Sequence, residues 1–552
     1  MDVVTLRRPR SRTPVALVFP PLWYYASVPG DLLDTGSFLR SRGVPVEAFD
    51  LSAGFTAGVL AAAPAFAALR RRDTYADRTA FRAAAAGVTQ AFEDVAARHR
   101  VLLNYNRFGF PGVDEGHVPS AREVGLDAAR NPALAALEAA VPKILAGDPA
   151  VVAIALVHPD QIVQAPVLAR LLRRAGFRGF LCLYGAHEDV VSPEDFAEDL
   201  VGSPRHVLFE DLDGVVVGEA ESALVALWEA VIGERPREGV PGLVAPTWGL
   251  DALPRTTAED LAALPPRDYE LVDPSIYPFP EPVIDLRISR SCPWGRCTFC
   301  AITLHQQGYR ARPAAGAGRD MEEAHRRLGS SFFRFRDDLL TPAQLRELSE
   351  LVPSLSFRPR WTARARFEAG LDRDTLRAAA AAGLEELWLG LESASARVRN
   401  LMVKGVAQKV VERILVDAAE AGIRVRALCM VGYPGETADE ARETLAFLQR
   451  HVFRIAHFSL TPFLLVRGTP LFRDPAAHGL TLLPDPRPRH ERIAFTWKAT
   501  GGSLLSAAEC DRFVEEATRF FGGWFAGDDV VGPTLSHGWM RASIRRREWQ
   551  SA

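Results

Sequence analysis

Short, continuous apolar runs alternate with helical stretches in two separate parts of this 552-residue chain. An apolar run of about 4–8 residues bounded by turn residues is typical of a parallel strand that helices cover on both faces. The alternation therefore predicts an α/β architecture in both parts. Residues 236–282 lie between them and are rich in proline, which prevents long regular elements, so we interpret this segment as a linker.

The first part, residues 1–235, is predicted to form a Rossmann-like domain. A helix is expected from Gly30 to Arg42, and about residues 52–146 read as an insertion of alanine-rich helices, broken near Asn104–His117. The insertion could serve packing alone or form part of a lid or partner surface. The predicted strands are Val15–Phe19, Val44–Phe49, Val151–Val157, Gly179–Tyr184 and Asp213–Val217.

The second part, residues 283–475, shows the strand–helix spacing of a βα barrel, complete or partial, of the TIM type. Polar residues follow several of its apolar runs, at the ends where barrel enzymes keep their chemistry. Residues 476–552 are expected to form a small, mainly helical C-terminal unit with one helix at Ser506–Phe521. The runs that predict strands are Val283–Ile288, Ser331–Arg336, Glu386–Leu391 and Val425–Val431, with His457–Leu460 after them.

Composition limits the classes of partner. A net charge of −3 argues against a general nucleic-acid binder, which needs a basic excess to neutralise phosphates. No run of about 18 apolar residues exists to span a membrane. The basic start, Met1–Pro14, is not followed by the apolar core of a signal peptide. Together with clustered rather than dispersed cysteines, these features predict a cytoplasmic protein.

Three of the six cysteines, Cys292, Cys297 and Cys300, fall within nine positions. Three thiolates can ligate a 4Fe–4S cluster and leave one iron without a protein ligand, open to a small molecule. Four cysteines would instead indicate a closed zinc site or an electron-transfer cluster. The other cysteines, Cys182, Cys429 and Cys510, lie more than 100 residues away in sequence. Residues distant in sequence can still be neighbours in the fold, so a closed site with a fourth cysteine stays an alternative.

The stretch RISRSCPWGRCTFCA (287–301) resembles the cluster motif of the radical S-adenosylmethionine (SAM) superfamily. The usual spacing there is C-x3-C-x2-C with an aromatic residue before the last cysteine. Phe299 occupies the aromatic position, but the first gap here holds four residues, Pro293 to Arg296. The resemblance implies a 4Fe–4S cluster whose open iron binds SAM, with Phe299 close to it.

Further stretches resemble SAM-binding motifs of the same superfamily. FRDDLL (335–340) is similar to the second-strand motif near the amino group of SAM, which implicates Asp337 and Asp338. LGLESAS (389–395) is similar to the fourth-strand motif, where Glu392 would bind the ribose hydroxyls with Ser393 beside it. A carboxylate that accepts two hydroxyl donors is physically reasonable there.

GYPGET (432–437) is similar to the glycine motif beside the adenine and implicates Gly432 and Gly435. The segment 401–405, LMVKG, resembles a Met-Asn-Lys-Gly motif with Val403 in place of the asparagine. For Asp338 and Glu436 a plain role as a helix cap stays open.

The order of strands, helices and turns in the first part resembles that of the cobalamin-binding domain that precedes many radical SAM domains. The matching stretches are VFPP (18–21), YGAH (184–187) and DGVVVGEAE (213–221), whereas no Asp-x-His-x-x-Gly motif follows the first strand. The resemblance implies a base-off cobalamin over the carboxyl ends of the strands. The alternative is a cofactor-free Rossmann-like domain that uses these residues in turns. The implied cobalamin-binding residues are His158, Gln161, Gly185, His187, Gly218 and Glu219.

Taken together, the resemblances imply a cobalamin-dependent radical SAM enzyme that takes electrons from a flavodoxin- or ferredoxin-type donor. The expected reaction is methyl transfer to an unactivated carbon of a natural-product or peptide substrate. One alternative is a rearrangement, ring contraction or cyclisation that uses the same cofactors without methyl transfer. Another is a non-catalytic iron–sulfur or zinc protein.

Overall fold

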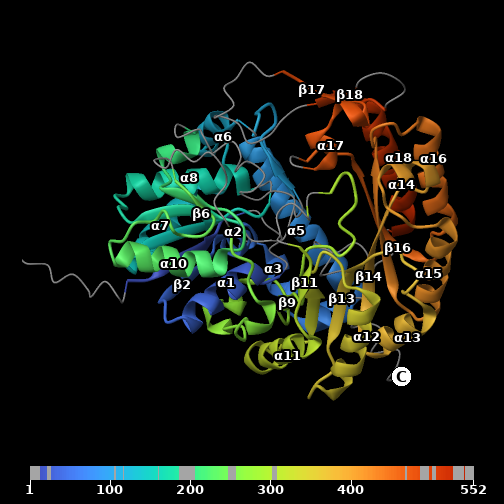
Figure 1. Cartoon of the computed structure of the whole chain (residues 1–552), viewed down its shortest axis with the longest axis horizontal. Coiled ribbons are helices and arrows are strands. Elements are labelled where there is room, and N and C mark those ends of the chain that lie inside the picture. The colour runs from blue at the N-terminus through green and yellow to red at the C-terminus, as the bar shows by residue number, and fades with distance from the viewer. Residues whose placement is uncertain are drawn as a thin grey trace, which may run out of the picture. The chain divides into compact units, whose positions relative to one another are not determined.

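The computed structural model of the chain divides into two compact units, each built around its own sheet (Figure 1). The first unit comprises residues 1–64, 88–278 and 485–495, and the second comprises 65–87, 279–484 and 496–552. The structure describes residues 13–21, 27–61, 63–104, 107–115, 117–158, 161–185, 206–245, 256–300, 302, 308–466, 469–484, 497–499, 505–525 and 540.

The sheet of the first unit has the strand order β2-β1-β5-β6-β7-β8. Its first five strands are parallel, and their order corresponds to the doubly wound 2-1-3-4-5 arrangement, in which ligands bind beyond the carboxyl ends of the strands. Every residue of β1, β5 and β6 is buried, as expected of strands covered on both faces. The strands are β1 (Val15–Phe19), β2 (Val46–Asp50), β5 (Val151–Ala155), β6 (Phe180–Tyr184), β7 (Gly214–Val216) and β8 (Leu243–Val244).

The five predicted strands of this sheet are confirmed, and so are the helices beside them. The sixth strand, β8, was not predicted: it is two residues long, lies in the proline-rich segment and pairs antiparallel with β7. The helices that follow the parallel strands are α1 (Gly30–Ser41), α8 (Gln161–Arg174) and α10 (Ala220–Ile232).

The predicted insertion consists of helices, and its break near residues 104–117 contains a short hairpin formed by β3 (Leu102–Asn104) and β4 (Arg107–Gly109). Residues 65–87 of the insertion group with the second unit rather than the first. The inserted helices are α2 (Leu51–Leu60), α3 (Pro64–Leu69), α4 (Arg72–Ala76), α5 (Arg78–His99), α6 (Val118–Gly125) and α7 (Leu134–Ala146).

The segment expected to be a linker belongs to the first unit as far as Pro278. Arg267 donates two hydrogen bonds to the Asp34 carboxylate, of 2.6 and 2.8 Å, and the Tyr277 hydroxyl donates one of 2.6 Å to Asp50. A buried arginine paired in this bidentate manner fixes the segment on helix α1 and strand β2.

The second unit is a six-stranded parallel sheet in the order β16-β15-β14-β13-β12-β9, so that consecutive strands are neighbours throughout. This arrangement confirms the predicted partial βα barrel. Figure 1 shows helices α11–α13, α15 and α16 along one face of the sheet. The strands are β9 (Val283–Leu286), β12 (Phe332–Phe335), β13 (Arg360–Ala365), β14 (Leu384–Glu392), β15 (Arg424–Val431) and β16 (Ile455–Pro462).

The helices of the second unit follow from its sequence pattern. Thr341 and Thr437 form capping boxes with Gln344 and Glu440, which fixes the first turns of α12 and α16. The C-terminal helix α18 (Ala507–Phe525), predicted at Ser506–Phe521, packs against β15 and β16. The remaining helices are α11 (Ala314–Leu328), α12 (Pro342–Leu351), α13 (Arg373–Ala381), α14 (Ala396–Leu401), α15 (Gln408–Glu420), α16 (Ala438–Arg450) and α17 (Pro470–Arg473).

Among the residues that the structure describes, no helix is both long enough and apolar enough to cross a membrane.

Candidate active site

The three clustered cysteines lie in the loop that follows β9 and the two-residue strand β10 (Ser289–Arg290). All three side chains are half-buried. Burial, with smaller contributions from the charges of Cys297 and Cys292, raises the pKa of the Cys300 thiol to about 12, so the three thiols lie within electrostatic reach of one another. Bound iron would supply the positive charge that such thiols need to ionise.

The closed four-ligand alternative has no counterpart in the described part of the chain, where no group of three or more His, Cys, Asp or Glu side chains could hold one metal ion. In a 4Fe–4S cluster each thiolate binds a different iron, so its ligands need not converge on one point. Cys182 and Cys429 are buried within β6 and β15. Cys510 packs against the backbone of Gly432, where a Cβ would lie 2.5 Å from its sulfur.

The four residues between Cys292 and Cys297 pack against residues 403–405. Gly295 takes a left-handed conformation with φ of 58°, and the Trp294 indole donates a 2.9 Å hydrogen bond to the Val403 carbonyl. A Cβ on Gly405 would lie 2.5 Å from the Trp294 ring, and the Arg366 guanidinium lies 3.7 Å from the ring centroid. The longer gap therefore contains an ordered contact with this segment.

The second half of the cysteine loop is held by three other segments through Thr298. Its backbone N–H donates to the Met402 carbonyl at 3.2 Å, and its hydroxyl lies 2.7 Å from the Tyr433 hydroxyl. Its carbonyl accepts from the N–H of Leu471 in α17 at 3.2 Å. These contacts position Cys297 and Cys300, which flank Thr298 in the loop.

Glu392 ends β14 in a left-handed conformation with φ of 62°, at a point where the register between β14 and β15 shifts. Its carboxylate pairs with Lys404 at 2.6 Å. Gly390 provides the space, because a Cβ there would lie 2.4 Å from the Glu392 carboxylate and 2.8 Å from the Lys404 ammonium. A non-glycine residue in this conformation costs about 1–2 kcal/mol, which the surrounding contacts must offset.

Lys404 connects the cysteine loop to Glu392. Its ammonium lies 5.9 Å from the centroid of the Phe299 ring, and its charge lowers the pKa of Cys297, which burial raises. Lys404 lies in the segment 401–405, but its sequence alone did not predict a role for this residue. The resemblance of that segment to a known motif was the signal that pointed to it.

Two of the predicted SAM-binding residues have their polar groups bonded within the protein. Asp337 is buried, and its carboxylate accepts hydrogen bonds from the backbone N–H groups of Ile288 and Ser289 and from the Ser289 hydroxyl, at 3.0, 2.5 and 2.6 Å. Ser393 is also buried, and its hydroxyl lies 3.2 Å from that of Thr444. In this structure both residues shape the turns that lead to the cysteines and away from Glu392.

Asp338, Gly432 and Gly435 also lie at the carboxyl ends of the strands. The charge of Asp338 raises the pKa of Cys300, so its carboxylate lies near the cysteine loop. Gly432 and Gly435 follow β15, and both have φ of 84°, a conformation that glycine adopts without steric cost. The structure thus brings the cysteines, Phe299, Asp338, Glu392 and the glycines to the carboxyl ends of the strands.

In the first unit, the predicted cobalamin-binding residues that the structure describes lie at or near the carboxyl ends of β5, β6 and β7. The Gln161 amide accepts a hydrogen bond from Val157 N at 2.9 Å and donates one to the Pro20 carbonyl at 3.3 Å. It therefore bridges the loops after β1 and β5. His158 follows β5 and is half-buried, and His187 lies outside the described residues.

The remaining candidates lie after β6 and β7. Gly185 is buried directly after β6, next to Tyr184, whose buried hydroxyl has no hydrogen-bond partner among the residues that the structure describes. A Cβ on Gly218 would lie 2.7 Å from the Thr256 side chain, so that glycine accommodates protein. The Glu219 carboxylate accepts from Glu259 N at 2.7 Å. A buried hydroxyl without such a partner suits a polar ligand, whereas the Gln161 amide makes two hydrogen bonds within the protein.

Residues 286–448 match the family model of the radical SAM superfamily. The matched region, less than a third of the chain, is a radical SAM domain. The fold of the whole chain is similar to that of TsrM, a radical SAM methyltransferase from Kitasatospora setae that was solved with cobalamin and a [4Fe–4S] cluster. The TM-score is 0.60 and the sequence identity 16%, over 98% of this chain and 100% of TsrM. The cobalamin-dependent SAM radical enzyme OxsB, solved with aqua-cobalamin and SAM, gives a TM-score of 0.62 and 13% identity, over 93% of this chain and 67% of that one.

Two curated sequences are also similar to this chain. An uncharacterised methyltransferase, PH0819 of Pyrococcus horikoshii, is 25% identical over 278 residues, which cover 49% of this chain and 60% of the relative. The ribosomal protein uS12 methylthiotransferase RimO of Desulforudis audaxviator is 26% identical over 278 residues, 48% of this chain and 56% of the relative. The match thus spans less than two thirds of either relative.

Val403 occupies a strained position in the radical SAM domain. Its φ is 54°, a left-handed conformation that a β-branched residue disfavours and that asparagine, the residue of the similar motif, tolerates. We expect Val403→Asn to raise the free energy of unfolding by about 1 kcal/mol. Thermal unfolding would measure this, with Val410→Asn in helix α15 as the control that gives no gain; an unchanged or lower midpoint for Val403→Asn contradicts the prediction.

Glu436 gives the radical SAM domain a pH-dependent stability. Its side chain is buried, and one carboxylate oxygen accepts a hydrogen bond from Gly432 N at 2.6 Å. Burial raises the Glu436 pKa from 4.5 to about 7. Between pH 4.5 and 7 the folded state binds more protons than the unfolded state. The contribution of Glu436 to the free energy of unfolding is therefore fully present below about pH 4.5 and is lost as the pH rises to about 7.

Glu436→Gln, which stays neutral, is therefore expected to gain stability relative to the natural protein as the pH rises from 5 to 8. The expected gain is about 2–3 kcal/mol, since one pKa unit corresponds to about 1.4 kcal/mol. Denaturant unfolding at several pH values would measure the difference. A constant difference across that range would refute the assignment.

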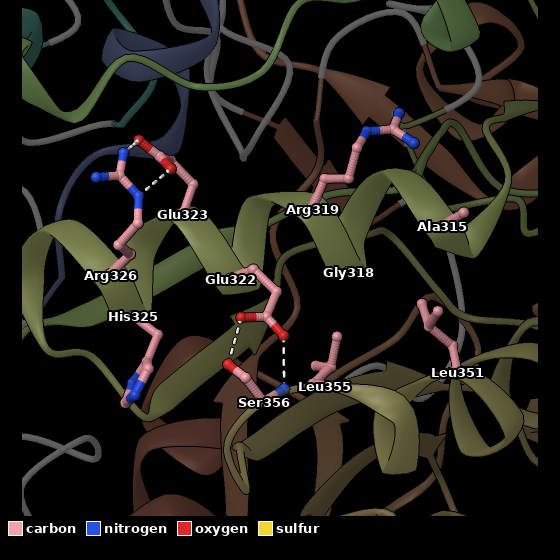
Figure 2. A pocket seen from close by; sticks show the side chains of 10 residues that line it. All are labelled: Ala315, Gly318, Arg319, Glu322, Glu323, His325, Arg326, Leu351, Leu355 and Ser356. Carbon is pink, nitrogen blue, oxygen red and sulfur yellow. Dashed lines mark hydrogen bonds and ion pairs between the residues drawn. The ribbon is translucent and has the colours of Figure 1, made fainter.

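A groove of about 560 Å³ lies on the outer side of the radical SAM domain, between α11 and residues 351–356 (Figure 2). Both of its acidic side chains are bonded within the protein: Glu322 accepts from the backbone N–H and the hydroxyl of Ser356, both at 2.6 Å, and Glu323 pairs with Arg326. His325 stacks on Phe357 with ring centroids 4.0 Å apart. These contacts join α11 to the segment beside it, and we assign the groove no ligand.

Proposed function

We propose that the protein is a cobalamin-dependent radical SAM methyltransferase that acts on an unactivated carbon of a small molecule or peptide. The observation that carries the proposal is the gathering of three thiols, Phe299 and the Glu392–Lys404 pair at the carboxyl ends of a parallel βα sheet. The matched radical SAM family and the fold shared with TsrM and OxsB support it.

In this proposal Cys292, Cys297 and Cys300 hold a 4Fe–4S cluster, which suits a set of three thiols without a fourth beside them. The Glu392 carboxylate accepts hydrogen bonds from the ribose hydroxyls of SAM. Gly432 and Gly435 allow the backbone to lie close to the adenine of SAM. Asp338 and Phe299 lie near the cluster, and Asp337 and Ser393 keep the adjoining turns in place. When bound, such cofactors supply reductive cleavage of SAM and a methyl group for the substrate.

Lys404 has two roles in the proposed site. It orients the Glu392 carboxylate through their 2.6 Å contact, and its charge favours the ionised form of Cys297. The carboxyl edge of the first unit is the proposed site of cobalamin, with Gly185 directly after β6. A flavodoxin- or ferredoxin-type protein would supply the electron.

The test begins with protein purified without oxygen. About four irons and about one corrinoid per chain after incubation with cobalamin are expected. The protein is then given a reductant, SAM labelled in the methyl group and a low-molecular-weight extract. Label in a new product supports methyl transfer, whereas label confined to methionine together with an altered product supports the alternative of a rearrangement or cyclisation. Zinc in place of iron after anaerobic reconstitution would overturn the proposal.

A further inference from the structure

Arg366 directly follows β13, at the carboxyl ends of the strands and beside the cysteine loop. Its guanidinium carbon lies 3.7 Å from the centroid of the Trp294 ring, and its side chain donates a hydrogen bond to the Lys404 carbonyl. Trp294 is one of the four residues between Cys292 and Cys297. The positive charge of Arg366 is therefore placed against the segment that connects two of the three proposed cluster ligands.

The Trp294 ring is a fixed support for this guanidinium. Its indole N–H is bonded to the Val403 carbonyl at 2.9 Å. A Cβ on Gly405 would meet the ring at 2.5 Å and the Arg366 guanidinium at 3.4 Å, so the two groups pack together against this glycine. Tryptophan gives the strongest cation–π attraction of the aromatic residues, and the planar guanidinium of arginine stacks well on its ring. These contacts keep the Arg366 charge in one position.

Lys404 is a second cation near Cys297, but its charge is offset. Burial raises the pKa of Cys297, and Lys404 lowers it. Glu392 lies 2.6 Å from Lys404 and raises the same pKa, so the two charges of this pair oppose each other at the cysteine. Arg366 also lowers the pKa of Cys297 and is not part of that pair. It therefore contributes the positive charge that the pair does not provide.

The cysteine loop is the main electrostatic partner of Arg366. Burial lowers the pKa of Arg366, and the charge of Cys297 opposes this effect more than the Glu368 carboxylate does. Arg296 also lies over the Trp294 ring, at 5.3 Å, but it is exposed, whereas Arg366 is half-buried. Solvent and salt screen exposed charges far more than partly buried ones, so Arg366 has the stronger effect on the loop.

We propose that Arg366, held in place by Trp294, raises the reduction potential of the 4Fe–4S cluster bound by the cysteine loop. The inference rests on the proposed function and deepens it, because it assigns positioning roles to two further residues of the same site. A flavodoxin- or ferredoxin-type donor adds one electron to the cluster, which makes the site more negative by one charge. A fixed positive charge nearby stabilises the reduced state more than the oxidised state, and the potentials of such clusters depend on the net charge of their surroundings.

Arg366→Gln is expected to lower the potential of the cluster. At a fixed solution potential, the ratio of reduced to oxidised cluster should fall about tenfold or more, and a tenfold change corresponds to about 59 mV for one electron. Arg366→Lys, which keeps the charge but loses the planar stacking group, should lower the ratio less. The measurement is an anaerobic redox titration of protein that carries its cluster and cobalamin. Electron paramagnetic resonance would follow it, because this method distinguishes the reduced cluster from cobalt(II).

Trp294→Leu tests the support without replacing the charge. The guanidinium is then no longer fixed over a ring, so we expect a smaller shift in the same direction. The double variant Trp294→Leu, Arg366→Gln should have the potential of Arg366→Gln alone, because Trp294 acts on the cluster through Arg366. A further fall in the double variant would overturn the positioning role of Trp294.

The matched control is Arg296→Gln, which removes an exposed charge near the same ring and should change the ratio by less than about twofold. An unchanged potential in Arg366→Gln, with or without a loss of stability, would overturn the inference, and so would an equal shift in Arg296→Gln. Iron and sulfide analysis of the same samples keeps the two proposals apart. A full cluster with an unaltered potential refutes the role of Arg366 alone, whereas natural protein that takes up no 4Fe–4S cluster refutes the proposed function together with it.

Discussion

Cys297→Ala should reduce the iron bound after anaerobic reconstitution from about four atoms per chain to nearly none, and SAM cleavage should fall below detection. Two thiolates leave two irons of the cluster without protein ligands, and the remaining thiols cannot compensate because the loop holds each in its own place. Thr298, next to Cys297, is bonded to residues 402, 433 and 471. Iron and sulfide analysis together with the optical spectrum would measure the effect.

The control for this experiment is Cys182→Ala, which removes a buried thiol from strand β6 of the first unit. It should retain iron and SAM cleavage in full. If Cys297→Ala kept a complete cluster and cleaved SAM, the loop would not be the cluster site. If both variants lost iron, the effect would reflect general damage to the protein rather than a missing ligand.

Glu392→Gln is expected to weaken SAM binding about 10- to 100-fold with the iron content unchanged. A hydrogen bond to a charged group contributes about 1.5–3 kcal/mol, and about 1.4 kcal/mol corresponds to a tenfold change in affinity. The glutamine keeps the size of the side chain but leaves Lys404 with a neutral partner in a half-buried place. Equilibrium binding of SAM to the reconstituted protein would measure the change.

Glu420→Gln, in an exposed pair with Arg373, is the matched control and should bind SAM normally. The double variant Glu392→Gln, Lys404→Met tests the pairing itself. If Lys404 acts by orienting the carboxylate, its removal should add little once Glu392 has been replaced. Unchanged SAM affinity in Glu392→Gln would instead exclude Glu392 from the SAM site.

The strands and the cysteine loop could be predicted because their signals are local. Val15–Phe19 and Val151–Val157 are uninterrupted apolar runs, and such runs become buried parallel strands. The surroundings of the loop could not be predicted in the same way. Trp294 bonds to Val403 and Thr298 to Tyr433, 109 and 135 residues away, and nothing in the local pattern specifies such pairs.

Asp337 illustrates a different limit of prediction. Its place at the end of a strand suggested a ligand contact, but its carboxylate is occupied by Ile288 and Ser289, 48 or 49 residues earlier. Sequence can indicate that an acidic residue lies at the active end of a sheet. Whether that residue faces the ligand or the backbone depends on which N–H groups the neighbouring strand leaves unpaired.

The packing of Cys510 on Gly432 has a consequence for the engineering of this protein. Helix α18 lies more than 50 residues beyond the last residue of the matched family region, 286–448, yet it closes over the glycine motif. A fragment trimmed to that region would keep every cysteine of the loop but lose the Leu471 bond to Thr298 and the cover on Gly432. The smallest unit able to work in isolation is therefore larger than the region by which its family is recognised.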